Sequence, residues 1–239
     1  MPNAYFKFKQ FTVYQDKCEM KVCTDACLFG AWLAAKVVNQ KVQKALDIGT
    51  GTGLLTLLLA QKTNAHIIAV ELDTQAALQA TENFNASPWR ERLLVENTSI
   101  QHFFSEEKYD LIFSNPPFFK NSLQSENNLK NMAKHATDLP LTILADKVDE
   151  LLTSEGKFGL LLPWQEFDNF RDVAARVNLH PAQITYVQQT PAHPYFRTMG
   201  IFTRKPSPAI TQETIVIKNS ANEYTYEFKE LLKDFYLYL

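Results

Sequence analysis

Three of the chain's seven glycines fall within five residues, in the run D-I-G-T-G-T-G at positions 47–53. The run follows a short apolar segment and leads directly into a leucine-rich segment with helical spacing. Glycine lets a backbone turn tightly and approach a ligand without a clash at Cβ, and the first N–H groups of a helix have no partner within it. An ordinary strand-to-helix turn does not need three glycines. The run therefore predicts a ligand-binding loop after a strand of an α/β sheet.

Short apolar runs alternate with longer helical patterns from residue 44 onward, which predicts βα units and a mostly parallel sheet. We expect a Rossmann-like α/β fold, with seven strands of which one is antiparallel, and with helices on both faces. The expected strands are 45–48, 66–70, 93–96, 110–114, 158–162, 183–188 and 199–203, and the expected helices are 54–61, 74–85, 139–153 and 166–177.

The two ends of the chain differ from this pattern. Phenylalanines alternate with polar residues at 6–13, which predicts a small strand, and an apolar helix is expected at 26–38. At the other end, 223–239 is expected to form an aromatic-rich helix docked on the body. We therefore expect an N-terminal extension at 1–43, packed on one domain at 44–239.

The formal net charge of −2 is unevenly distributed. Residues 1–44 contain seven lysines against three acidic residues, a local charge of +4 that leaves −6 for the rest of the chain. A basic extension on an acidic body indicates an anionic partner such as a nucleic acid. A solvated charged face explains the same charge equally well.

Cysteine use and hydropathy weigh against several classes of protein. Cys18, Cys23 and Cys27 are odd in number and contain no CxxC pair, which disfavours a disulfide framework and a zinc site. We expect reduced thiols that pack as small apolar groups. No apolar run is long enough to span a bilayer, and the first residues lack the pattern of a secretory signal. We expect a cytoplasmic protein without a metal, a membrane or an obligate protein partner. The three tryptophans, at 32, 89 and 164, are expected to pack in the core or at helix edges.

The spacing of the glycines indicates which class of ligand the loop binds. Dinucleotide folds seat a pyrophosphate on G-x-G-x-x-G, whereas this loop is G-x-G-x-G preceded by Asp47. The Asp47 carboxylate can accept from an ammonium or anchor the turn, and it repels a pyrophosphate. Glu71 ends the second strand at a position that suits a ribose diol, while Asp73 is expected to cap the next helix. The pattern favours S-adenosylmethionine, with further contacts expected from Gly49, Thr50, Gly51, Gly53 and Leu72.

A polar loop, N-P-P-F at 115–118, follows the strand expected at 110–114. An amine conjugated to a ring is a poor nucleophile because its lone pair is delocalised. The side-chain oxygen of Asn115 and the carbonyl of Pro116 can each accept one N–H and orient that lone pair toward a methyl donor. Pro117 stiffens the loop, and Phe118 offers a face for stacking a base. Alone, the run fits a strand-ending turn, but after the glycine loop it predicts methylation of a planar nitrogen.

The pair of loops resembles amino-methyltransferases that carry an [NDS]-P-P-[YF] motif. The segments K-Q-F at 9–11, M-K-V at 20–22 and G-A-W at 30–32, with T-D between the last two, are similar to the N-terminal signature of the bacterial tRNA1(Val) adenine N6-methyltransferase family. The resemblance continues through K-N-M-A-K-H at 130–135 and the tail F-Y-L-Y at 235–238. It implies a class I methyltransferase fold and, as substrate, the N6 amine of adenosine-37 beside the anticodon of tRNA1(Val).

The same resemblance implies roles for further residues. Thr24 and Asp25 are placed at the mouth of the cofactor pocket, although helix capping is their default role. Ser99 stands where the class usually has an acid that contacts the adenine amine. From the residues alone, Arg197 is expected in an exposed loop between the last two strands, where it can contact RNA or form a local salt bridge. The candidate RNA contacts are Lys9, Lys21, Lys130, Lys134, His135 and Arg197, with lysine at 130 and 134 where the family usually has arginine.

Three alternatives stay open. A ribosomal RNA guanine N2-methyltransferase also uses N-P-P-F but commonly carries a duplicated N-terminal domain, for which this chain is too short. A release-factor glutamine methyltransferase usually ends the motif in tyrosine and has a helical N-terminal domain. A non-catalytic RNA-binding protein that retained the fold is disfavoured by Asn115 together with an intact glycine loop.

Overall fold

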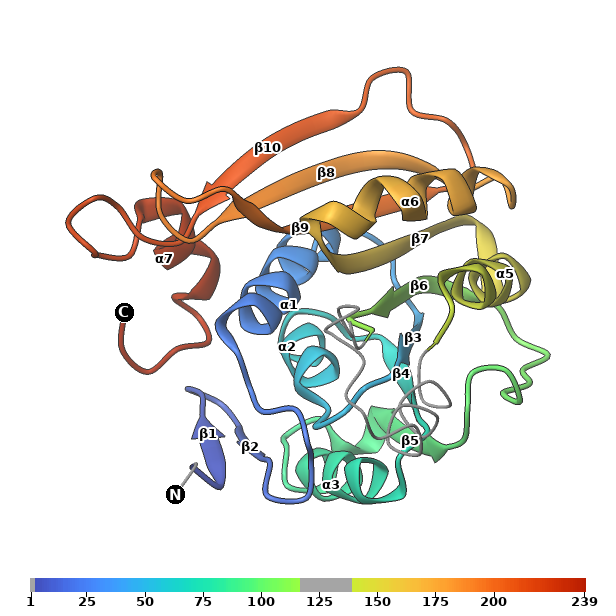
Figure 1. Cartoon of the computed structure of the whole chain (residues 1–239). Helices are drawn as coiled ribbons and strands as arrows, with labels where there is room; N and C mark the ends of the chain where they lie inside the picture. The colour runs from blue at the N-terminus through green and yellow to red at the C-terminus, as the bar shows by residue number, and fades with distance from the viewer. Residues whose placement is uncertain (1–2, 117–138) are drawn as a thin grey trace, which may run out of the picture.

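A computed structural model of the chain describes residues 3–116 and 139–239. Within these residues the core is an eight-stranded sheet with helices on both faces, and Figure 1 shows the strands following one another from β10 to β5. The elements of this core are β3 (Lys44–Ile48), α2 (Leu54–Lys62), β4 (His66–Glu71), α3 (Thr74–Asn85), a 3-10 turn (Arg90–Arg92), β5 (Leu93–Asn97), β6 (Tyr109–Ser114), α5 (Leu141–Leu151), β7 (Leu152–Pro163), α6 (Trp164–Ala175), β8 (His180–Gln188), β9 (Tyr195–Thr203) and β10 (Thr211–Val216).

The strand order is β10-β8-β9-β7-β6-β3-β4-β5. Only β9 runs against its neighbours β7 and β8, so the expected mostly parallel sheet with one antiparallel strand is confirmed. The eighth strand, β10, was not predicted. It lies at an edge of the sheet and buries little more than Ile215, so its sequence lacks the apolar pattern of a central strand.

Each face of the sheet packs against its own helices. Helices α1 (Thr24–Val37), α2 and α3 cover one face, and their apolar side chains pack with Phe113 and Leu161 of the central strands. Helices α5 and α6 cover the other face, where Phe170 of α6 packs edge-on against Phe202 of β9. Strands buried on both faces are apolar throughout, which is why they could be located from the sequence. No helix in the described ranges is long and apolar enough to cross a membrane.

The N-terminal extension differs from its prediction. The single strand expected at 6–13 is wrong, because the chain forms a hairpin of β1 (Tyr5–Lys7) and β2 (Thr12–Tyr14). The turn between the strands is closed by the N–H of Phe8, which donates to the carbonyl of Phe11 at 2.9 Å. Phe8 and Phe11 stack at 4.5 Å between ring centroids, so both aromatic rings stay inside the turn.

The C-terminal tail is helical only in part. Helix α7 (Tyr226–Leu232) is capped by Thr225, and the predicted continuation of the helix to 239 is wrong. The chain instead turns back, so that the N–H of Lys9 donates to the carbonyl of Phe235 at 2.8 Å and Tyr236 packs against Phe8 at 5.9 Å. The tail therefore docks on the body as predicted, but it does so through a turn that contacts the N-terminal hairpin.

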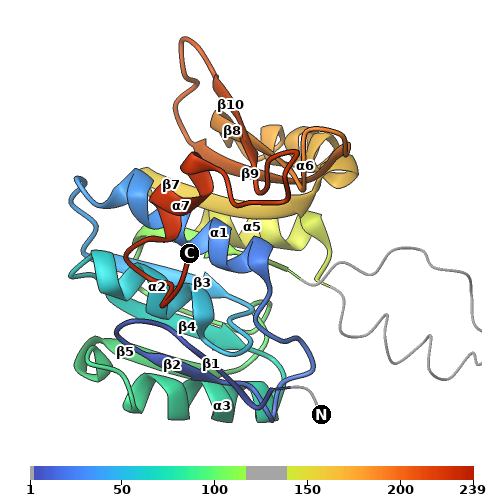
Figure 2. The ribbon, with the colours of Figure 1, turned by 90° about the vertical axis from the view of Figure 1, so that its left-hand side faces the viewer.

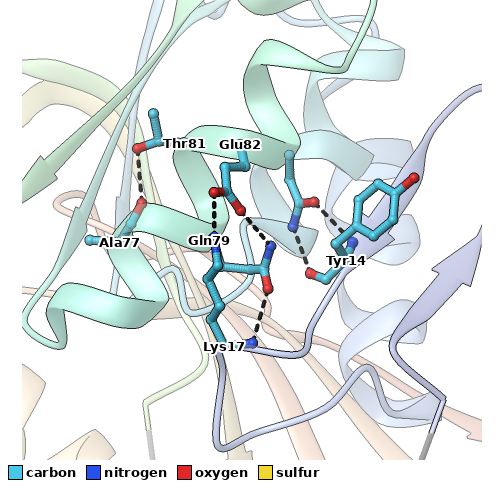
Figure 3. A network of polar contacts seen from close by, with 7 residues as sticks. Tyr14, Lys17, Ala77, Gln79, Thr81 and Glu82 are labelled. Carbon is cyan, nitrogen blue, oxygen red and sulfur yellow. Dashed lines mark hydrogen bonds and ion pairs between the residues drawn. The ribbon is translucent and has the colours of Figure 1, made fainter.

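Helix α3 connects the extension to the glycine loop. Figure 3 shows the polar contacts that tie Tyr14 and Lys17 to the side chains of α3. Asn83 is 1% exposed; it accepts from the N–H of Tyr14 at 2.9 Å and donates to the carbonyls of Tyr14 and Thr52, both at 2.8 Å. One buried amide therefore bridges strand β2 and the loop after β3, and Figure 2 shows the hairpin lying beside α3.

This bridge gives a stability prediction. Replacing Asn83 with Ala removes all three hydrogen bonds and leaves the Thr52 carbonyl without its partner, so we expect the free energy of unfolding to fall by about 2 kcal/mol. Lys17→Ala is the matched control, because it removes only the partly exposed ion pair with Glu82 and should cost less than about 1 kcal/mol. Urea denaturation measures both values. Equal losses in the two variants would show that Asn83 is not the connection we describe.

Candidate active site

The glycine loop at 49–53 joins β3 to α2 in a left-handed conformation. Gly49, Gly51 and Gly53 have φ angles of +74°, +55° and +82°, which residues with a Cβ rarely adopt. A Cβ on Gly53 would lie 2.4 Å from the ring of Phe84, so this glycine is required for packing on α3. A Cβ on Gly49 or Gly51 would meet nothing within 4 Å. The loop therefore has open space above its first two glycines, where a ligand can approach the backbone.

Asp47 anchors this loop from below. Its side chain is fully buried, and one oxygen accepts from the hydroxyls of Thr50 at 2.7 Å and Thr56 at 2.8 Å. The other oxygen, Oδ1, is buried without a hydrogen-bond partner in the described structure. Burial raises the pKa of Asp47 to about 7, although the two threonine hydroxyls lower it. Anchoring the turn, one of the two roles expected for Asp47, is therefore observed, and the unpaired Oδ1 lies below the loop, out of contact with solvent.

Glu71 holds the loop from the neighbouring strand. Its Oε2 accepts from the N–H of Gly51 at 2.8 Å, and its Oε1 accepts from the N–H of Asp73 at 2.9 Å. A carboxylate has about four lone-pair sites, so each oxygen keeps one for a ribose hydroxyl. Asp73 caps α3 as predicted, by accepting from the N–H of Ala76 at 2.8 Å. Leu72 is 51% exposed beside these carboxylates and offers an apolar surface.

The end of β5 contributes Asn97, a residue of the site that was not predicted from the sequence. Asn97 donates to the carbonyls of Glu71 at 2.9 Å and Leu72 at 3.1 Å, and it accepts from the hydroxyl of Thr74. It therefore holds together the ends of β4 and β5. In the sequence, the only sign of this role is that Asn97 is an amide residue at the carboxyl end of an expected strand. Ser99 lies in the turn that follows, half-buried, with its hydroxyl 3.1 Å from Nδ1 of His102.

The register of the sheet places Asn115 beside the glycine loop. Ser114, the last residue of β6, pairs with Ile48, the last residue of β3, and its hydroxyl donates to the Ile48 carbonyl at 2.8 Å. Asn115 and Gly49 therefore leave neighbouring strands at the same level, about 5 Å apart by the spacing of strands. Asn115 is half-buried and Pro116 is buried. The other predicted residues of this region, Pro117, Phe118, Lys130, Lys134 and His135, lie outside the described residues.

Asp25 and Arg197 form an ion pair. A local salt bridge was one of the two roles open for Arg197, but its partner, 172 positions away in the sequence, was not predicted. Helix α1 begins after Cys23, and neither Thr24 nor Asp25 acts as its N-cap, so their predicted capping role is wrong. Oδ2 of Asp25 accepts from Nε of Arg197 at 2.7 Å. Burial acts to raise the pKa of Asp25, but the hydrogen bonds from Cys23 and Arg197 outweigh it and hold that pKa below its ordinary value.

Arg197 lies in β9 rather than in the exposed loop that was expected, because the strand begins at Tyr195, two residues earlier. Its half-buried side chain also lies over the ring of Phe196, with 5.7 Å from the guanidinium carbon to the ring centroid. The guanidinium is therefore bound within the protein and links the start of α1 to the start of β9.

The lysines of the extension mostly bind the protein itself. Lys9 donates to the carbonyl of Lys233 at 2.5 Å, and Lys21 donates to the carbonyls of Gln15 and Cys18. Two more lysines pair with acidic residues of the body, in the pairs Lys17–Glu82 and Lys36–Glu213, and Lys44, the first residue of β3, pairs with Glu107 within the body. Lys9, Lys17 and Lys36 therefore dock the extension on the body, whereas Lys21 binds within the extension. Exposed pairs of this kind are weak, so an RNA phosphate can compete for them.

The cysteines are free thiols. Cys18 and Cys27 are buried, and burial raises the pKa of Cys18 to about 11 and that of Cys27 to about 12. Both therefore stay protonated and pack as small apolar groups, as expected, whereas Cys23 is exposed at the start of α1. In the part of the chain that is described, no three His, Cys, Asp or Glu side chains gather as a metal site would require.

Comparison with known proteins agrees with this arrangement. The family model "Methyltransferase small domain" matches residues 24–141. A protein of Cytophaga hutchinsonii is 45% identical over the whole of both chains, and one of Phocaeicola vulgatus is 42% identical over 99% of both. Both relatives are named tRNA1(Val) (adenine(37)-N6)-methyltransferase.

The fold has a counterpart among solved structures. A Listeria monocytogenes protein described as a class I S-adenosylmethionine-dependent methyltransferase has a TM-score of 0.60 at 14% identity, over 84% of this chain and 67% of that one. This likeness confirms the Rossmann-like class I methyltransferase fold. Identity above 40% over the full length decides the family. The chain belongs to the tRNA1(Val) (adenine(37)-N6)-methyltransferase family of S-adenosylmethionine-dependent enzymes.

Proposed function

We propose that this protein transfers the methyl group of S-adenosylmethionine to the exocyclic N6 amine of adenosine-37 in tRNA1(Val). The observation that carries the proposal is the register that sets Asn115 beside the glycine loop. Relatives with this activity in their names match the chain from end to end, which supports the same substrate. Such a substrate favours a cytoplasmic enzyme that needs no metal and no obligate protein partner.

The residues around the glycine loop suit the cofactor. When bound, S-adenosylmethionine supplies an electrophilic methyl group on a positively charged sulfur. Open space above Gly49 and Gly51 leaves room for it, and the remaining lone pairs of Glu71 suit its ribose hydroxyls. Ionised Asp47, directly below the loop, compensates positive charge. We assign the adenine side of the pocket to Leu72 and Ser99, and its mouth to Thr24 and Asp25.

Asn115 and Pro116 prepare the amine. Each offers one carbonyl oxygen, and together these oxygens can accept both N–H groups of an adenine amine. Accepting both bonds turns the nitrogen lone pair toward the methyl group and stabilises the positive charge that grows on nitrogen. The proton leaves after transfer, so a general base with a shifted pKa is not required. We place the target adenine over the end of β6, next to the loop that follows β3.

No observation favours the guanine N2 alternative. The described part of residues 1–43 is a hairpin followed by one helix, rather than a second domain. The relatives compared above match this chain over at least 99% of both lengths. A duplicated N-terminal domain therefore has no counterpart in this comparison.

The first test replaces Asn115. Asn115→Ala removes one acceptor for the amine, so we expect methyl transfer to unmodified tRNA to fall by about a hundredfold or more. Binding of S-adenosylmethionine, measured by calorimetry, should stay within about twofold.

Asn115→Asp is the matched variant, because it keeps an acceptor oxygen of the same size. It should retain more activity than the alanine variant. If Asn115→Ala loses cofactor binding as much as methyl transfer, the role we assign to Asn115 is wrong.

A second test uses the pH dependence of cofactor binding. Asp47, with its pKa raised to about 7, is mostly neutral at pH 5.5 and ionised at pH 8. A bound cation favours the ionised form and lowers its pKa, so binding should tighten as the pH rises through this range. We expect the affinity of the wild type relative to Asp47→Asn, whose side chain stays neutral, to rise by about tenfold between pH 5.5 and pH 8.

Thr56→Val provides a second variant with little change in side-chain shape. It removes a hydrogen bond that lowers the pKa of Asp47, so the midpoint of the pH dependence should move upward. Calorimetric titration with S-adenosylmethionine at several pH values measures each case. If the ratio of the affinities of wild type and Asp47→Asn for S-adenosylmethionine stays constant with pH, the predicted coupling between ionisation of Asp47 and cofactor binding is wrong.

A further inference from the structure

Three aromatic side chains lie in contact at the carboxyl edge of the sheet, and none of them belongs to the site proposed above. Trp164 begins α6, Tyr195 begins β9, and Tyr186 lies two residues before the end of β8. The ring centroids of Trp164 and Tyr195 are 6.3 Å apart, and those of Tyr195 and Tyr186 are 5.0 Å apart and stacked. We call these three residues the aromatic row.

A β-bulge places Tyr195 in this row. Val187 pairs with Arg197, but the next residue, Gln188, pairs with Tyr195, so Phe196 is an extra residue in β9. In a regular strand, Tyr195 would share a face with Arg197, which reaches Asp25 of α1. The bulge instead lets Tyr195 contact Tyr186 and Trp164, on the side of the sheet covered by α6. Bulges of this kind often re-aim a side chain next to a functional site.

The aromatic row continues outward from the catalytic loop. In the sheet, β6 is followed by β7, β9 and β8. Asn115 follows β6, Trp164 follows β7, and the two tyrosines belong to β9 and β8. Ser114 pairs with Leu160, so Asn115 is level with Leu161, three residues before Trp164. With strands about 5 Å apart and a rise of about 3.3 Å per residue, Trp164 lies about 5 Å to the side of Asn115 and about 10 Å further along the strand direction. Tyr195 lies one strand further out at a similar height, so the row begins about 11 Å from Asn115. It therefore lies where the nucleotides next to a base bound at Asn115 would pass.

The rings remain accessible. Trp164 is 45% exposed, although burial of a tryptophan is favourable, and Tyr195 is half-buried. The segment 189–194 beside them, Q-T-P-A-H-P, contains no acidic residue, and the acid next to Trp164 in the sequence is the exposed Glu166 in the first turn of α6. Each base has a flat face that can stack on such rings, and proteins that bind single strands use aromatic side chains in this way.

The proposed substrate indicates which ligand the aromatic row binds. An adenine that is turned out of its stack leaves neighbouring bases without a stacking partner. We propose that the aromatic row stacks the anticodon-loop bases that flank the methylated adenine, with Trp164 and Tyr195 as the contact residues. Tyr186 supports Tyr195 from below, because it also packs on the core. This inference rests on the proposed function and adds the surface that binds the flanking nucleotides.

Steady-state kinetics of the full-length enzyme test the proposal. We compare Trp164→Ala and Tyr195→Ala with the conservative variants Trp164→Phe and Tyr195→Phe, using unmodified tRNA1(Val) as substrate. Each alanine variant should raise the KM for tRNA by about tenfold and leave the dissociation constant of S-adenosylmethionine within about twofold. The phenylalanine variants should stay within about threefold of wild type, because they keep a ring. Tyr226→Ala is the control, since Tyr226 is a 73% exposed tyrosine on α7.

Tryptophan fluorescence separates this inference from the proposed function. A base stacked on Trp164 should quench its emission, so titration with an anticodon stem-loop should quench the wild type and quench Trp164→Phe much less. The other tryptophans are Trp32, which is 1% exposed, and Trp89, which packs against the core.

Loss of quenching in Trp164→Phe supports the aromatic row even if no methyl group reaches tRNA, a result that would overturn only the proposed function. Normal methylation by the wild type with an unchanged KM in both alanine variants would overturn the aromatic row and leave the proposed function intact.

Discussion

The left-handed glycine loop is the constraint on which the rest of the site depends. A backbone with three positive φ angles is held by Asp47 through two threonine hydroxyls, by Glu71 through the N–H of Gly51, and by Asn83 through the carbonyl of Thr52. These anchors belong to three different elements, so the loop is fixed before any ligand binds. A preorganised loop does not have to be ordered at the moment of binding. The neighbouring strand then sets Asn115 at the same level.

The N-terminal extension takes part in this support. Its hairpin is joined to α3 through Asn83, and Lys9 and Phe8 hold the C-terminal tail. Half of its six lysines, Lys9, Lys17 and Lys36, are bound to the body of the protein. The basic residues of the segment 1–44 therefore help to attach the extension to the body, in addition to the binding of an anionic partner that their charge indicates. The ion pair of Asp25 with Arg197 continues this connection across to β9.

Much of the fold could be predicted because buried parallel strands are apolar on both faces and the glycine loop has a distinctive spacing. The misses share a physical cause, which is that local sequence does not report long-range partners. Strand β10 is polar because it is an edge strand, and the tail after Leu232 turns because Phe235 and Tyr236 meet the N-terminal hairpin. Helix α1 begins at Thr24, so Asp25 lies in its first turn rather than at its N-cap, and it pairs with a residue 172 positions away. Asn97 and the bulge at Phe196 are visible only once strands are paired.

The central claim is that the paired loops at 47–53 and at Asn115 methylate one adenine amine in tRNA. The most direct measurement incubates the full-length protein with labelled S-adenosylmethionine and unmodified tRNA1(Val), followed by nucleoside analysis. A transcript with guanosine in place of adenosine-37 is the matched control. The account predicts labelled N6-methyladenosine from the first transcript and no label in the second. Label in N2-methylguanosine, equal label in both transcripts, or no transfer at all would contradict it.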